Sequence, residues 1–253
     1  MIGVFDSGLG GLSVLAALVD ALPSANFIYF ADTAHVPYGN KSEEQIQCRV
    51  LAIGEHLASH DCDLLVVACN TATTTAVQAL RAAHPGIPVV GIEPGIKPAA
   101  QETRSGRIAV LATEATANSQ RLQHLIRQHA GNVEVFVEPC PGWATHVEML
   151  QLGDPALAAD VRARIEPLLE KGVDRIVLGC THYSFLAPLL TEVVGTRAQL
   201  VDVAAAVARQ TQRLAGGLAH GSGLLQLHAS AHPERLRAAL PRLHLGHLAA
   251  RVI

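Results

Sequence analysis

Short apolar segments alternate along the chain with longer segments in which apolar residues recur every three or four positions. In the longer segments this spacing predicts amphipathic helices, as for the leucines at 12, 15, 18 and 22 and for residues 76–84 and 119–129. Strands that are apolar on both faces and alternate with helices are typical of parallel sheets covered on both sides, so we predict an α/β fold. The predicted strands are residues 2–5, 26–31, 64–68, 88–92, 107–112, 133–138, 175–179 and 224–229.

A faint internal repeat suggests two similar halves. "LLVVACNT" and "RIVLGCTH" are both strands that end in a cysteine followed by small polar residues, a pattern that also arises by chance. Two α/β halves facing each other would place Cys69 and Cys180 across a shared cleft. We therefore predict two domains, each a mainly parallel sheet flanked by helices, with the active site between them. Residues 1–95 plus 206–253 form the first and 96–205 the second, with the Pro- and Gly-containing stretch 91–99 as the linker.

Composition argues against several classes of protein. The chain of 253 residues is 49% hydrophobic and 16% charged, which indicates a globular protein and not a disordered one. A net charge of −3 offers no basic field for nucleic acid or an anionic membrane, and no apolar run is long enough to span a bilayer. The N-terminus lacks the basic region of a signal peptide. Five cysteines without a CxxC pair do not fit a disulfide framework, so we expect a cytoplasmic protein.

Polar residues follow the first predicted strand at the edge where α/β sheets bind ligands. Asp6 and Ser7 stand there, before the "GLGG" that leads into a helix. Any tight strand-to-helix turn uses such residues. Alternatively, "GLGGLS" is an imperfect dinucleotide fingerprint, with Ser13 at its third glycine and Asp32 where a ribose partner would lie. The negative charge of Asp6 beside a pyrophosphate argues against that alternative.

Two cysteines end predicted strands, and each is either buried packing or a reactive thiol. Cys69 precedes Asn70 at the start of a helix, whose positive end would favour the thiolate and lower its pKa from about 8.5 toward roughly 3.5–7.5. Cys180 is followed by Thr181 and His182, and this histidine could serve as its acid–base partner. A metal site at Cys180 and His182 would need further ligands, which the spacing does not supply, so we expect no metal.

The remaining cysteines have weaker signals. Cys48 and Cys62 lie in or near apolar helical segments, and we assign both to packing. Cys140, in "EPCPGW", fits packing better than chemistry.

Six motifs together resemble those of bacterial glutamate racemases, in the same order and over nearly the whole chain. They are "IGVFDSGLGGLSV", "DTAHVPYGNKS", "VVACNTATTTA", "GIEPGIKPA", "VLATEAT" and "IVLGCTHY". The resemblance implies an enzyme of the aspartate/glutamate racemase superfamily that uses no cofactor, with two α/β domains and two catalytic cysteines. In bacteria its D-glutamate product supplies peptidoglycan synthesis. Because the motifs begin at residue 2, we expect no N-terminal extension for a cell-wall-precursor activator.

Matched position by position, the resemblance implies a role for each site residue. Cys180 takes the proton from L-glutamate and Cys69 takes it from D-glutamate. Asp6 assists Cys69, whereas His182 and Glu148 assist Cys180. The chain departs from the family pattern at Thr145 and His146, close to Glu148. The implied substrate contacts are Asp6, Ser7, Tyr38, Gly39, Asn70, Thr71, Thr181 and His182.

Two other classes of function stay open at this stage. One is a related superfamily enzyme, such as an aspartate racemase with the same two thiols or a decarboxylase or isomerase with one. The other is a nucleotide-binding module without chemistry. We expect a small-molecule substrate and no nucleic-acid or membrane partner, and the sequence leaves homodimer formation open.

Overall fold

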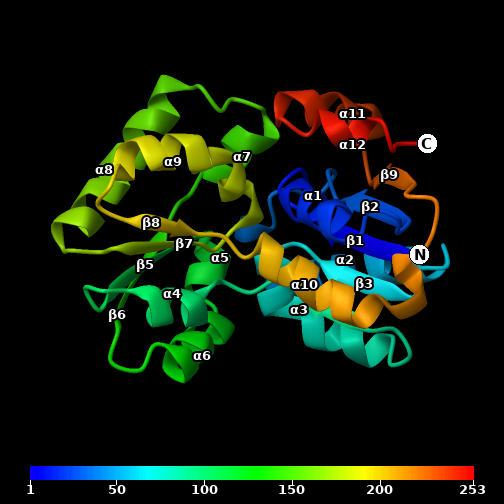
Figure 1. Ribbon diagram of the computed structural model, residues 1–253, viewed down its shortest axis with the longest axis horizontal. Helices are drawn as coiled ribbons and strands as arrows, with labels where there is room; N and C mark the ends of the chain where they lie inside the picture. The colour runs from blue at the N-terminus through cyan, green and yellow to red at the C-terminus, as the bar shows by residue number, and fades with distance from the viewer.

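All strands of this protein are parallel, and they form two sheets in separate lobes (Figure 1). The computed structural model describes residues 1–253. The order of the first sheet is β4-β3-β1-β2-β9, and that of the second is β6-β5-β7-β8. The first comprises β1 (Ile2–Asp6), β2 (Phe27–Ala31), β3 (Leu64–Val67), β4 (Val89–Gly91) and β9 (Leu225–Ala229). The second comprises β5 (Arg107–Ala112), β6 (Glu134–Pro139), β7 (Arg175–Leu178) and β8 (Gln199–Val201).

The first sheet is buried on both faces, as its uninterrupted apolar strands predict. In β2, Phe27 and Tyr29 belong to the core on one face, whereas Ile28 and Phe30 belong to the core on the other. The period of two in a strand sends alternate side chains to opposite faces, so the strand must be apolar throughout. The first face is covered by α1 (Leu12–Ala21), α10 (Ala204–Ala215), α11 (Pro233–Arg242) and α12 (Gly246–Ala249). The second is covered by α2 (Glu43–Ala58) and α3 (Asn70–Ala83).

The second sheet is covered in the same way. One face packs on α7 (Trp143–Glu148), α8 (Pro155–Glu170), α9 (Ala187–Val194) and the 3₁₀ helix η2 (Thr181–Leu186). The other packs on α4 (Ile96–Glu102), α5 (Glu114–Ala117) and α6 (Gln120–His129). The shorter 3₁₀ helices η1 (Tyr38–Asn40) and η3 (Gly216–Ala219) lie in the first lobe. The predicted α/β class and its two sheets are therefore confirmed.

The chain passes between the lobes twice. It leaves the first sheet after β4 and returns after β8, where α10 packs against α1 (Figure 1). The predicted linker at 91–99 is too long, because Ile96 and Ala99 are buried in the core of the second lobe as part of α4. The domain boundaries at 95/96 and 205/206 stay a proposal, supported by which strands share a sheet.

Local sequence signals explain several helix ends. Ser42 and Gln45 form a reciprocal capping box at the start of α2. Asp154 caps α8, whose first residue, Pro155, has the backbone φ angle that a helix start needs. No helix in the structure has both the length and the apolar character needed to cross a membrane.

Candidate active site

The two strand-end thiols are both buried and come from different lobes. Cys69 follows β3 and caps α3, and its Sγ accepts a hydrogen bond from the Ala72 amide at 3.4 Å. Cys180 follows β7 at the start of η2. Their exposed fractions are 5% and 6%, so reagents and substrate reach them to a similar small extent.

Asp6 lies at the end of β1 beside Cys69, with no exposed surface. Its Oδ1 accepts a hydrogen bond from the Gly8 amide at 2.8 Å, and its Oδ2 accepts one from the Thr181 hydroxyl at 3.2 Å. Burial raises the pKa of Asp6, although the positive charge of His182 opposes that shift. The carboxyl group is thus fixed at the junction of the two lobes.

The environment of Cys69 holds its proton in place. Burial raises the pKa of the Cys69 thiol, and the charges of Asp6 and Cys180 raise it further. The sequence-based expectation of a lowered pKa at the helix start is therefore wrong. The Ala72 amide does lower the pKa, but desolvation of the thiolate is the larger effect. Burial in this fold therefore favours the protonated form of Cys69.

Cys180 has an imidazole and a carboxylate behind it. His182 Nδ1 lies 3.6 Å from Cys180 Sγ, and His182 Nε2 lies 2.5 Å from Glu148 Oε1. The same Glu148 oxygen accepts a hydrogen bond from the Leu9 amide of the other lobe at 2.6 Å. Burial alone would lower the pKa of His182, but the hydrogen bonds to Cys180 and Glu148 outweigh it and raise this pKa well above the usual value. These hydrogen bonds therefore favour the imidazolium form of His182.

Glycines of the first turn leave room for this arrangement. A Cβ atom on Gly8 would collide with the Glu148 carboxylate, and one on Gly10 would collide with the His182 ring. "DSGLGG" therefore needs glycine because two side chains of the opposite lobe approach the backbone there. Neither glycine has a positive φ angle, so close packing, and not backbone conformation, is the reason.

The other predicted contact residues surround Cys69. The side-chain amide of Asn70 is buried, and neither its oxygen nor its nitrogen has a hydrogen-bond partner in the protein. The Thr71 hydroxyl lies 3.0 Å from that of Thr113 and 3.3 Å from that of Thr116. Buried polar groups are nearly always paired, so the free amide of Asn70 indicates a ligand contact.

The Tyr38 hydroxyl already has a partner within the protein. It donates to Asp32 Oδ2 at 2.7 Å, so its proton is not available to a substrate. A Cβ on Gly39 would lie 3.0 Å from Thr113 Cβ, so this glycine lies beside the Thr71 cluster. Sequence reasoning missed Thr113, Thr116 and the Leu9 amide, although both threonines stand in the quoted "VLATEAT".

Comparison with known proteins agrees with these motifs. The family model described as Asp/Glu/Hydantoin racemase matches residues 2–211. The chain belongs to this racemase family. The glutamate racemase of Pseudomonas aeruginosa is 45% identical over 246 residues, which cover 96% of this chain and 93% of that protein. That of Methylococcus capsulatus is 48% identical over 212 residues, covering 84% of this chain and 78% of that protein.

Solved structures of racemases share the fold. The glutamate racemase isoform RacE1 from Bacillus anthracis superimposes with a TM-score of 0.86 at 29% identity, covering 97% of this chain and 94% of that one. The Escherichia coli glutamate racemase was solved with L-glutamate and the activator UDP-MurNAc-ala. It superimposes with a TM-score of 0.83 at 34% identity, covering 96% of this chain and 94% of that one. The two-lobed arrangement is thus that of solved racemases.

Glu148 lies against His182 despite the departure from the family pattern at Thr145 and His146. His146 Nδ1 faces Asp154, at 3.6 Å from Oδ2. The helix α7 that holds these residues still directs Glu148 to His182.

Asp32 has a structural role, so the dinucleotide interpretation loses its ribose partner. Both carboxylate oxygens of Asp32 bind the Arg49 guanidinium at 2.9 Å, and Oδ2 also accepts from Tyr38. This fully buried carboxylate ties the loop after β2 to α2. It has no free oxygen facing the turn at Gly8 and Gly10.

We expected the three other cysteines to have packing roles, and two of them are buried. Cys62 is buried in the first lobe and Cys140 in the second, which confirms packing for Cys62 and fits it for Cys140. Cys48 is exposed on α2, so its assignment to packing is wrong. Its neighbours Ile46 and Val50 take the two buried positions on that turn of the helix.

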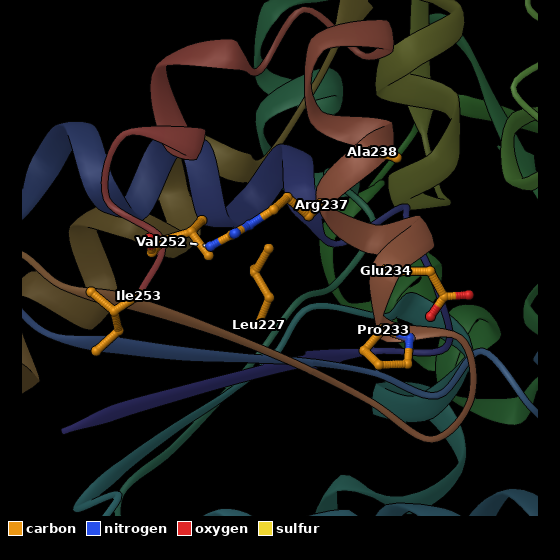
Figure 2. Close-up of a pocket in the computed structure, with 7 residues that line it drawn as sticks. All are labelled: Leu227, Pro233, Glu234, Arg237, Ala238, Val252 and Ile253. Carbon is orange, nitrogen blue, oxygen red and sulfur yellow. Dashed lines mark hydrogen bonds between the residues drawn. The ribbon is translucent and has the colours of Figure 1, made fainter.

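Two of the hollows on the surface bear on where the site lies. One, of about 670 Å³, lies between β9, α11 and the last residues of the chain, and Figure 2 shows Leu227, Arg237 and Val252 around it. It contains none of the predicted site residues. The other, of about 530 Å³, is lined by Leu9, Glu148 and residues of α11, and therefore adjoins the site.

Proposed function

We propose that this protein interconverts L- and D-glutamate by proton transfer at Cα between Cys69 and Cys180, without a cofactor. The observation that supports this most strongly is the pair of buried thiols from opposite lobes, each with its own acid–base partner. Asp6 serves Cys69, and His182 with Glu148 serves Cys180.

Inversion at Cα removes a proton from one face and returns one to the other. Two bases on opposite sides accomplish this without moving the substrate. Starting from L-glutamate, Cys180 takes the Cα proton while Cys69 gives its own proton to the far face. The reverse reaction exchanges the two roles, and the proton count of the enzyme is restored through solvent.

The charges around the thiols support this direction of transfer. An imidazolium at His182 stabilises a negative charge on the sulfur 3.6 Å away. Burial favours the protonated form of Cys69, which is the form that delivers a proton.

The carbanion formed at Cα needs stabilisation through the substrate carboxylate. The Asn70 amide, unpaired in the protein, and the hydroxyls of Ser7, Thr71 and Thr181 are suited to hold it. Asp6 and His182 complete the contacts, with Tyr38 and Gly39 at the side of the Thr71 cluster. These assignments rest on position and hydrogen-bonding capacity.

The names of the relatives favour glutamate over aspartate as the substrate of this protein. Those reported above are named glutamate racemases, and the Escherichia coli structure contains L-glutamate. An aspartate racemase with the same two thiols is the alternative. We further propose that the D-glutamate supplies peptidoglycan synthesis and that the protein acts in the cytoplasm; homodimer formation stays a prediction.

A racemisation assay tests the proposal. Purified protein treated with chelator and dialysed should racemise L-glutamate without pyridoxal phosphate, metal or nucleotide, as followed by polarimetry. L-aspartate is the matched control and should turn over far more slowly. Activity that disappears on dialysis and returns with a cofactor would overturn the cofactor-free mechanism.

Racemisation in heavy water distinguishes a mechanism with two bases from a mechanism with a single base. Cys69 exchanges its proton with solvent before substrate binds, so D-glutamate formed early from L-glutamate should contain deuterium at Cα. The remaining L-glutamate should contain almost none. Mass spectrometry of the separated enantiomers at low conversion decides, and unlabelled D-glutamate would rule out opposed thiols.

A further inference from the structure

Three histidines gather at one edge of the first lobe, away from the active site. His56 lies in the last turn of α2, His60 lies in the turn just after that helix ends, and His228 lies on the edge strand β9. One potential ligand atom from each lies within 4.8 Å of the other two. None of the three takes part in the hydrogen bonds around the thiols, so the proposed function leaves this cluster unexplained.

The spacing suits a small metal ion. Zn²⁺ binds imidazole nitrogens at about 2.0–2.1 Å, and tetrahedral angles then place two ligand nitrogens roughly 3.3 Å apart. His56 Nε2 and His228 Nδ1 are 3.0 Å apart. The candidate ligand atom of His60 lies within 4.8 Å of those of His56 and His228. The rings of His56 and His60 lie side by side, with centroids 4.3 Å apart.

Neighbouring groups orient two of the rings. His228 Nε2 lies 3.2 Å from Gln226 Oε1, which accepts its proton and leaves the Nδ1 lone pair directed at His56. His60 Nδ1 lies 2.7 Å from the His56 carbonyl oxygen and donates its proton to it. The other ring nitrogen of His60, Nε2, is then free to bind a metal ion. Metal-binding histidines usually have their second nitrogen fixed by such an acceptor. Phe30 packs edge-on against His56 with ring centroids 5.0 Å apart, which limits its motion.

All three candidate ligand groups are imidazoles. A cluster with three imidazoles and neither thiolate nor carboxylate matches late first-row divalent ions rather than Mg²⁺ or Ca²⁺.

We propose that His56, His60 and His228 bind one divalent transition-metal ion, Zn²⁺ or a close relative, with water as the fourth ligand. The site is structural in effect. It would join α2 to an edge strand that is 172 residues away in sequence, and so secure the C-terminal segment to the first lobe.

Calorimetric titration of the chelator-treated protein with Zn²⁺ tests this. The wild type should bind one ion per chain at this site, and its melting temperature should rise with Zn²⁺, because an ion that binds only the folded state stabilises it. His60→Ala and His228→Ala should lose both effects. Gln226→Ala should weaken binding by about 10–100-fold through the freed His228 ring. His124→Ala, an exposed histidine on α6, is the matched control and should bind as wild type does.

Co²⁺ distinguishes this cluster from the active-site thiols. A three-imidazole site should give ligand-field absorption without a sulfur-to-cobalt charge-transfer band, and His60→Ala should abolish that absorption. Failure of the wild type to bind Zn²⁺, equal Zn²⁺ affinity in His60→Ala, or a charge-transfer band that persists in that variant would each overturn the proposal. These readouts do not involve racemisation, so they stand apart from the proposed function.

Discussion

The Thr181 hydroxyl donates a hydrogen bond to Asp6 Oδ2 at 3.2 Å, across 175 residues of sequence. Thr181 follows β7 and Asp6 ends β1, so this bond joins the carboxyl ends of the central strands of both sheets. Each sheet brings its strand-end residues to one edge, and the two edges face each other. The thiols that follow β3 and β7 meet at the same junction.

Replacement of either thiol should stop the reaction. Cys69→Ser and Cys180→Ser should each lower kcat by about 10²–10⁴-fold or more, because a serine hydroxyl is too weak an acid to replace the thiol as a proton donor and base. Cys48→Ser, at an exposed position on α2, should keep full activity. Polarimetry measures turnover, and circular dichroism verifies the fold. Full turnover in either of the first two variants would refute the two-thiol mechanism.

Gly10→Ala should damage catalysis while leaving the fold intact. The added methyl group displaces the His182 ring, whose two nitrogens face Cys180 and Glu148, so the ring cannot move without losing a contact. We expect a fall in kcat of at least about tenfold, within the range of general acid–base effects. Gly86→Ala is the control, since nothing lies within 4 Å of its added Cβ. Equal activity of both variants would show that the close approach at Gly10 is unimportant.

Burial should slow alkylation of the Cys69 thiol. At neutral pH, iodoacetamide should alkylate Cys69 much more slowly than exposed Cys48, because the thiolate is the nucleophile and burial raises the pKa of Cys69. Raising the pH should speed the labelling of Cys69. Peptide mass spectrometry at short times measures the order of labelling, and Cys69 reacting before Cys48 would contradict a protonated Cys69.

The ionisation of Asp32 should make the free energy of unfolding depend on pH. Burial alone would raise the pKa of Asp32, but hydrogen bonds from Arg49 and Tyr38 outweigh it and hold this pKa below its usual value. The ionised carboxylate therefore stabilises the fold above the unfolded-state pKa of about 3.9, and this contribution is lost as pH falls through the lower folded-state value. Asp32→Asn should lower the free energy of unfolding at pH 7 by about 1.5–3 kcal/mol.

Urea unfolding at neutral and acidic pH checks this dependence. The difference between wild type and Asp32→Asn should shrink on acidification, because the wild-type carboxyl becomes neutral as well. Asp20→Asn, an exposed acid on α1, should change stability by less than about 0.5 kcal/mol. A constant difference at all pH values would mean that the charge of Asp32 is not what stabilises the loop.

The sequence by itself determined the elements that buried apolar patterns define. Residues 2–5 and the strand Leu64–Val67 carry no polar side chain, which indicates burial on both faces, and the α/β class follows. The short strand Gln199–Val201 was missed, because three residues show no periodicity. The two thiols were identified because each follows such a strand. The domain boundaries and the roles of the substrate contacts stay predictions.

Only the tertiary structure decided what the residues around those thiols do. Local sequence placed Cys69 at a helix start and so predicted a lowered pKa, whereas desolvation by the whole fold raises it. Gly10 is needed because His182, 172 positions later, packs against it, and Asp32 is occupied by Arg49 instead of a ligand. His56 and His228 are equally distant in sequence and meet at a sheet edge. Burial and long-range contact depend on how the strands are ordered in space, and a pattern of neighbouring residues does not contain that order.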